Sequence, residues 1–414
     1  MRIRARVQSS GRAGKIPAMR APRSWDIFCR VVDNYGDAAV CWRLARGLAA
    51  ASGAGRRTRL WIDDLSVLHK LLPGIAPGKE SQSAAGVEIC HWTAEAEFGE
   101  PAEVAVDAFG CGIPEDYAEA MAAPSRRRPR SLAIILEYLS AEPWVARHHG
   151  LPSPHPRLPL ARFFFFPGFG EGTGGLLREP GLSARREDFL ARPQAREALW
   201  REAGFAPPAA EATLVTLFGY ENPALGALLE AWAAGGRPVV AAVPESRLAA
   251  GVAACLGAGS PARGEAVRRG ALEVRFLPFL AQDRYDELLW GADWNFVRGE
   301  DSFVRAQWAE RPFVWHIYPQ AEHAHLAKLE AFLTAYCKGL APVLARPLRA
   351  LWRGWNASGE APERAVSSAW AGLSALTPGQ LAALRLHAHD WAVKAAQSGD
   401  LAENLADFCV KRLK

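Results

Sequence analysis

Short apolar runs alternate with amphipathic stretches along the first half of the chain. The runs predict strands at 25–32, 58–64, 87–92, 102–110 and 131–140. Between the first two runs, apolar residues recur at helical spacing over 38–52. Strands that alternate with helices predict a parallel sheet wrapped by helices.

The alternation stops over residues 141–185, where proline, glycine and aromatic residues are frequent and no regular period fits. We expect a long connection there that carries surface or active-site loops. The pattern restarts after residue 205, and its apolar runs predict strands at 212–222, 237–246, 271–280, 293–301 and 312–318. From about residue 376 the chain is expected to be helical and to pack back across both halves. The sequence thus predicts two βα domains in tandem, with a ligand in the cleft between them at the carboxyl ends of the strands.

Length and composition agree with a protein of this class. The 414 residues are too many for one core, and half are hydrophobic while 22% are charged, as in ordinary soluble proteins. The longest apolar runs are too short to cross a bilayer. Seven scattered cysteines without a CxxC pair favour reduced thiols and a cytoplasmic location.

The net charge of +5 comes from the first 24 residues, which hold seven Lys/Arg and no acid. Without them 42 basic residues face 44 acidic ones, a net charge of −2, which does not indicate a nucleic-acid binder. The leader lacks the apolar region of a signal peptide, although its composition loosely fits a transit peptide. We expect residues 1–24 to be a disordered tail, and Met19 is a candidate for the true start.

Two aspartates, Asp33 and Asp37, lie four residues apart in VVDNYGDAAV, where the first strand turns into a helix. A carboxylate at such a turn, facing a cleft, could act as a general base. The alternative is that Asp33 caps the helix and Asp37 is a solvated first-turn acid.

A second strand-to-helix turn, VRGEDSFVRAQWA, places Arg298 before a predicted helix N-terminus. Free N–H groups and an arginine together form a good anion site. Glu300 and Asp301 would be unusual beside an anion and could instead accept from sugar hydroxyls, with Ser302 or Asp301 as the N-cap. A simple capped turn explains the same residues equally well.

Aromatic residues mark two further strand ends. Phe218 and Tyr220 in TLFGYEN fall on one side of a strand, where they could stack a nucleobase, although core packing is the commoner use. Gln282 and Tyr285 in PFLAQDRYDELL begin a helix that could wall a base pocket.

Several familiar motifs are missing. The chain has no Asp-x-Asp, no GxGxxG after the first strand, no P-loop and no GxSxG elbow. His316, His323 and His325 cluster in sequence, but no cysteine lies near them, so a zinc site is disfavoured.

Three long stretches, taken together, point to one family. They are WDIFCRVVDNYGDAAVCWRLA, FPGFGEGTGGLLRE and FVRGEDSFVRAQWAERPFVWHIYPQ. Over about residues 25–410 the chain resembles the bacterial protein-arginine rhamnosyltransferases that modify elongation factor P. The resemblance implies the α/β GT-B fold, with an N-terminal Rossmann-like domain at 25–185 and a nucleotide-sugar-binding one at 205–391. It also implies that a C-terminal helix at about 392–414 packs back on the first domain.

The same resemblance implies an inverting transfer of L-rhamnose from TDP-β-L-rhamnose to an arginine of elongation factor P, which supports translation of polyproline stretches. It implies no cofactor and no metal, and neither nucleic acid nor membrane as partner; a monomer is expected. Asp37 matches the general base, with Asp33 and Glu300 also catalytic. The donor-binding positions that it implies are Asn34, Tyr35, Gly36, Phe218, Tyr220, Gln282, Tyr285, Arg298, Glu300, Asp301 and Ser302.

Two departures from the family pattern are visible, the basic leader and Ala281 where proline is expected. Two alternatives also stay open at this point. One is a GT-B glycosyltransferase with another donor or acceptor, and the other is a non-catalytic nucleotide-sugar-binding protein.

Overall fold

The computed structural model describes residues 22–52, 56–123, 131–259, 264–357 and 361–413. Residues 1–21 of the expected leader, including Met19, therefore lie outside the described residues. Among the helices described, none is long and apolar enough to cross a membrane.

The first sheet has seven strands in the order β3-β4-β2-β1-β5-β6-β7. All neighbours are parallel except the β3–β4 hairpin. The strands are β1 (Ser24–Cys29), β2 (Arg57–Ile62), β3 (Ser81–Ala84), β4 (Val87–His91), β5 (Val104–Ala108), β6 (Leu132–Leu136) and β7 (Ala161–Phe165). The central strands are buried on both faces, as helices on both sides of a parallel sheet require.

The second sheet has six strands in the order β10-β11-β9-β8-β12-β13, again parallel except for one edge hairpin, β10–β11. The strands are β8 (Thr213–Leu217), β9 (Val239–Pro244), β10 (Ala266–Arg269), β11 (Leu272–Leu277), β12 (Trp294–Arg298) and β13 (Phe313–His316). Both edge hairpins were missed by the sequence analysis, because their outer strands are short and largely exposed.

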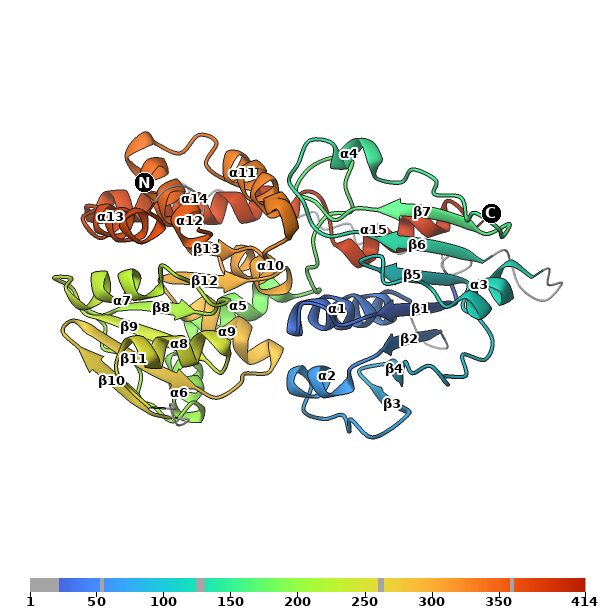
Figure 1. The fold of residues 1–414 in the computed structure, drawn as a ribbon, viewed down its shortest axis with the longest axis horizontal. Coiled ribbons are helices and arrows are strands. Elements are labelled where there is room, and N and C mark those ends of the chain that lie inside the picture. The colour runs from blue at the N-terminus through green and yellow to red at the C-terminus, as the bar shows by residue number, and fades with distance from the viewer. Residues whose placement is uncertain (1–21, 53–55, 124–130, 260–263, 358–360, 414) are drawn as a thin grey trace, which may run out of the picture.

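Helices cover both sheets (Figure 1). In the first part of the chain they are α1 (Tyr35–Ser52), α2 (Leu65–Leu71), α3 (Glu115–Ala122), α4 (Val145–His148), α5 (Leu182–Ala191) and α6 (Pro193–Glu202). The second part contains α7 (Leu225–Ala233), α8 (Arg247–Cys255), α9 (Gln282–Gly291), α10 (Asp301–Trp308) and the short 3-10 turn η1 (Ala321–His323). The last helices are α11 (Ala324–Tyr336), α12 (Pro342–Trp355), α13 (Pro362–Ser374), α14 (Pro378–Ala396) and α15 (Leu401–Val410).

The expectation of an irregular connection over 141–185 was wrong in part. Strand β7 extends the first sheet beside β6, and α4 lies just before it. The phenylalanine run of 163–166 favours a strand, and neighbouring prolines and glycines concealed it. The glycine-rich stretch that follows leads into α5, which packs with its neighbour α6 and with α9 of the second half.

The chain passes between the two halves twice. The second passage returns it to the first half, where α15 packs against α1 (Figure 1). The two passages are joined by hydrogen bonds, from the Leu401 N–H to the Leu176 carbonyl (3.0 Å) and from the Arg178 N–H to Asp400 Oδ2 (2.8 Å).

Strand order changes direction at β1 in the first sheet and at β8 in the second, because β1 lies between β2 and β5 and β8 lies between β9 and β12, so the order runs outward on both sides of each strand. In open α/β sheets, ligands bind beyond the carboxyl ends of the strands at such points. The turn from β1 to α1 and the turn from β12 to α10 both lie there, and they face each other.

Candidate active site

The turn between β1 and α1 is held by the carboxylate of Asp37. Its Oδ2 accepts the backbone N–H groups of Val32 (2.9 Å) and Asp33 (2.8 Å). Burial raises the pKa of Asp37, against the lowering effect of these two hydrogen bonds. Asp37 is therefore a buried side chain that stabilises the turn, and it also lines a cavity at the cleft.

Asp33 points from this turn across the cleft. Its Oδ2 accepts the Tyr220 hydroxyl at 2.7 Å, and its Oδ1 accepts Arg298 Nη1 at 3.2 Å. Both partners belong to the second half of the chain. Burial raises the pKa of Asp33 to about 6, although the nearby Arg298 charge and the Tyr220 hydrogen bond lower it.

Two glycines make room for the Asp33 carboxylate, one from each half of the molecule. A Cβ on Gly36 would lie 2.7 Å from Asp33 Oδ2, and a Cβ on Gly299 would lie 2.6 Å from the same atom. Gly299 also has a φ of +60°, which glycine adopts most readily. Larger residues at either position would push the carboxylate out of this place.

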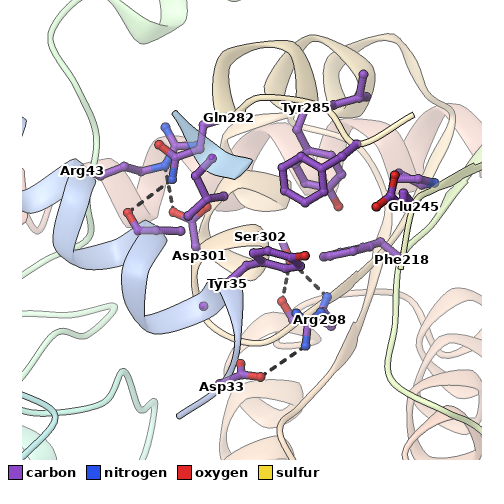
Figure 2. Close-up of a pocket in the computed structure, with 16 residues that line it drawn as sticks. Asp33, Tyr35, Arg43, Phe218, Glu245, Gln282, Tyr285, Arg298, Asp301 and Ser302 are labelled. Atoms are coloured by element: carbon purple, nitrogen blue, oxygen red, sulfur yellow. Dashed lines mark hydrogen bonds and ion pairs between the residues drawn. The ribbon is translucent and has the colours of Figure 1, made fainter. Parts of the chain in front are cut away.

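Arg298 ends β12, and its side chain lies among aromatic rings (Figure 2). The guanidinium carbon is 4.6 Å from the ring centroid of Tyr220, 5.0 Å from that of Phe218 and 6.0 Å from that of Tyr35. The following turn is closed by Ser302, whose hydroxyl accepts the Arg298 N–H at 3.1 Å and donates to the Arg298 carbonyl. The aromatic rings and this turn together give the guanidinium a defined position.

Glu300 lies in the cavity that also contains Asp33 and Asp37. Its Oε2 accepts the N–H of Leu139 from the first half at 2.9 Å. Burial raises the pKa of Glu300 to about 8, while the positive charge of Lys328 lowers it. Three carboxyl groups therefore meet in one cavity, which Tyr138 and Lys328 also line.

A more apolar cavity extends from Arg298 in another direction. Phe218 and Tyr285 meet edge to face there, with ring centroids 5.6 Å apart. The Gln282 amide nitrogen donates to the Ala39 carbonyl at 3.3 Å, and this hydrogen bond fixes the orientation of the amide. The Gln282 Oε1 is buried and has no hydrogen-bond partner among the described residues. An unsatisfied buried acceptor is costly unless a ligand supplies the donor.

The Asp301 side chain points away from Arg298 (Figure 2). Its Oδ1 accepts Arg43 Nε at 2.8 Å, and Arg43 Nη1 also contacts Glu179 at 2.7 Å. Arg305 completes the cluster through Asp286 (2.6 Å) and Glu179 (2.7 Å). This buried network joins α1 to α9 and α10, so it fixes how the two halves meet. The carboxylate of Asp301 is thereby occupied, and what remains for a ligand is the helix N-terminus.

All the site residues expected from the sequence lie at or beside the cleft. Asn34, at a φ of 45°, lines a wide, open cavity together with Tyr35, Tyr220 and Arg298. Sequence reasoning missed four groups of the site: Arg43, Tyr138, Phe279 and Lys328. Tyr138 lies at the end of the predicted strand at 131–140, just after β6, and a strand end is a usable signal. Arg43 and Lys328 lie inside helices, where no local pattern marks a site residue.

The three histidines lie in different surroundings. His316 Nδ1 accepts the Tyr220 N–H at 3.3 Å, and burial lowers the pKa of His316 to about 3, so it is neutral. The rings of His323 and His325 lie 6.0 Å apart on the next segment. In the part of the chain that the structure describes, no group of three or more His, Cys, Asp or Glu side chains is placed to hold a metal ion.

Two Rossmann-like domains with a ligand cleft between the carboxyl ends of their strands define the GT-B class of glycosyltransferases, and the predicted fold is confirmed. Over residues 25–410 the chain matches the model of the family described as elongation-factor P (EF-P) rhamnosyltransferase EarP, and it belongs to that family.

Named relatives agree with this assignment. The chain is 46% identical over 386 residues to a protein-arginine rhamnosyltransferase of Pseudomonas putida, covering 93% of this chain and 98% of the relative. It is 47% identical over 385 residues to the enzyme of the same name from Pseudomonas aeruginosa, with coverage of 93% and 98%.

A solved structure extends the match to three dimensions. It concerns EarP-mediated arginine glycosylation of translation elongation factor EF-P, and it matches with a TM-score of 0.65 and 36% identity. The match covers 93% of this chain and 98% of the other. The protein is thus a glycosyltransferase of the protein-arginine rhamnosyltransferase family.

Proposed function

We propose that this enzyme transfers L-rhamnose from TDP-β-L-rhamnose to an arginine side chain of elongation factor P, with inversion and without a metal ion. One observation carries the proposal beyond the family assignment. The turn after β1 presents carboxylates to the cleft, and the turn after β12 presents an arginine among aromatic rings directly opposite. The carboxylates can therefore bind a cationic acceptor, and the arginine can bind an anionic donor.

The apolar cavity suits the thymine base of the donor. Phe218 and Tyr285 supply aromatic walls, and the unpaired Gln282 Oε1 is an acceptor for the N3–H of thymine. The diphosphate then falls at Arg298 and at the first N–H groups of α10, where the helix dipole favours negative charge. These groups stabilise the departing TDP in the way that metal ions do in other sites.

The carboxylate cavity suits the guanidinium of the acceptor. This group is a poor nucleophile because its charge is delocalised and its pKa lies above about 12. Asp33 holds it by charge-assisted hydrogen bonds, and the Glu300 carboxyl, whose pKa burial raises to about 8, accepts a further hydrogen bond. Together they aim one nitrogen at C1 of the sugar. Asp37 accepts the proton as the C–N bond forms and the bond from C1 to the TDP oxygen breaks. Inversion follows because acceptor and leaving group lie on opposite faces of the sugar.

Elongation factor P acts in translation, so the proposal also places the reaction in the cytoplasm, and we expect a monomer to suffice. The test is the intact mass of elongation factor P from the same organism, measured before and after incubation with enzyme and TDP-β-L-rhamnose. A gain of one deoxyhexose is expected, unchanged by EDTA.

Controls separate donor from acceptor. An acceptor whose target arginine is replaced by lysine should gain nothing, and TDP-glucose should not replace the donor. Donor binding without any transfer would instead support a non-catalytic nucleotide-sugar-binding protein. Transfer from another nucleotide sugar, or to another protein, would redirect the assignment within GT-B enzymes.

A further inference from the structure

Both carboxylate oxygens of Asp33 are engaged by residues of the other domain. Arg298 contacts Oδ1 and Tyr220 contacts Oδ2. The contact is well enclosed, since the side chains of Arg298 and Asp33 are only 10% and 11% exposed. The two glycines at 36 and 299 are what allow the pair to form at this distance.

This pairing conflicts with the roles that the reaction requires. Arg298 is the cation that would meet the donor's diphosphate, and Asp33 is an anion that would meet the acceptor's guanidinium. While they are paired, each neutralises the other, and neither is available.

We propose that the Asp33–Arg298 contact is a latch between the domains which the donor's diphosphate opens, so that the donor binds before the acceptor arginine. The inference rests on the proposed function and adds an order of binding to it. A diphosphate carries more charge than a single carboxylate and offers more oxygens to the guanidinium, so it displaces Asp33 from Arg298.

The surrounding side chains keep Arg298 and Asp33 in the cleft after their contact is broken. The aromatic rings around Arg298 keep its guanidinium in place while its partner changes. Tyr220 retains its hydrogen bond to Asp33 Oδ2, so the carboxylate stays in the cleft with Oδ1 free. The uncompensated charge of Asp33 then favours a new cation, which is the acceptor guanidinium. Donor and acceptor therefore strengthen each other's binding reciprocally.

The first experiment measures TDP affinity by calorimetry and needs no acceptor. If Asp33 competes with the diphosphate, Asp33→Asn should bind TDP more tightly than the wild type, by about fivefold or more. Asp37→Asn is the matched control, because its carboxylate belongs to the same turn but does not contact Arg298. Equal or weaker TDP binding by Asp33→Asn, or an equal gain in both variants, would overturn the latch. A circular dichroism melt verifies that both variants are folded.

The second experiment measures the affinity for elongation factor P with and without TDP, which cannot support turnover. TDP should tighten binding of the wild-type acceptor by about fivefold or more and leave an arginine-to-alanine acceptor unchanged. If the intact-mass assay shows transfer but the affinity for elongation factor P is the same with and without TDP, the latch is overturned and the proposed function stands. If no transfer occurs at all, the proposed function fails, and the TDP titration still decides whether Asp33 and the diphosphate compete.

Discussion

The turn after β1 and the turn after β12 have the same plan but use different chemistry. In each, the first residue faces the cleft and the residue four positions later holds the turn. Asp33 and Asp37 play these parts in one turn, and Arg298 and Ser302 play them in the other. The residue that holds the turn is a neutral hydroxyl beside the proposed donor site and a carboxylate beside the proposed acceptor site.

Under the proposed function, Asp37 combines two roles: it holds its turn, as Ser302 does, and it also takes part in the reaction. A serine at the fourth position satisfies the backbone at little cost. A buried carboxylate there pays a desolvation penalty, which is visible in the raised pKa of Asp37. That penalty is explained if Asp37 accepts a proton during transfer as well as holding the turn.

Asp37→Asn should have the largest effect, and it tests whether Asp37 acts as a base in addition to holding the turn. The amide oxygen can still accept the two backbone N–H groups, so the turn should persist while the base is lost. We expect the transfer rate to fall by about 10²- to 10⁴-fold with an unchanged melting temperature. Wild-type turnover in this variant would reduce Asp37 to the structural role that Ser302 has.

Arg298→Met tests the opposite side of the cleft. The methionine fills similar space among the rings but has no charge for the leaving TDP. The rate of transfer should fall by about 10²- to 10³-fold, and TDP binding should weaken in calorimetry. Arg298→Lys keeps the charge without the planar fork and should recover only part of the loss. Full activity of the methionine variant would remove Arg298 from the donor site.

The pH dependence of kcat/KM for elongation factor P sharpens the role of Asp33. Because burial raises its pKa to about 6, the carboxylate form is lost as the pH falls through that value. A protonated Asp33 cannot pair with the guanidinium, so kcat/KM should fall about tenfold per pH unit below the inflection. Asp33→Asn should be slow and should lose the inflection near pH 6 that Asp33 causes. If the inflection persists in that variant, it belongs to another group.

Ser302→Ala should give the smallest effect and tests the structural half of the plan. It removes the hydroxyl that bridges the N–H and the carbonyl of Arg298. Thermal or denaturant unfolding should show a loss of about 1 kcal/mol. The KM for the donor should rise more than kcat falls. A large fall in kcat with normal stability would instead place the Ser302 hydroxyl in the chemistry.

The two turns could be found in the sequence because a strand end, a glycine and acidic residues coincide in each. The alternative that made Asp37 a solvated first-turn acid was wrong, because this side chain is buried and accepts the N–H groups of Val32 and Asp33. Asp301 shows the limit, since its carboxylate pairs with Arg43, 258 positions away. The residues around Asp301 in the sequence do not indicate such a distant partner. The catalytic roles of the site residues stay predictions. Strand β7 was missed for the opposite reason, because local glycine and proline obscured a tertiary pairing.

The return of α15 to pack on α1 has a consequence for how the protein is made. Synthesis runs from the N-terminus, so the first domain leaves the ribosome long before the helix that covers it. Until residues 401–410 emerge, the face of α1 that α15 later buries is exposed to solvent. The first domain is therefore completed only after residues 401–410 have been synthesised.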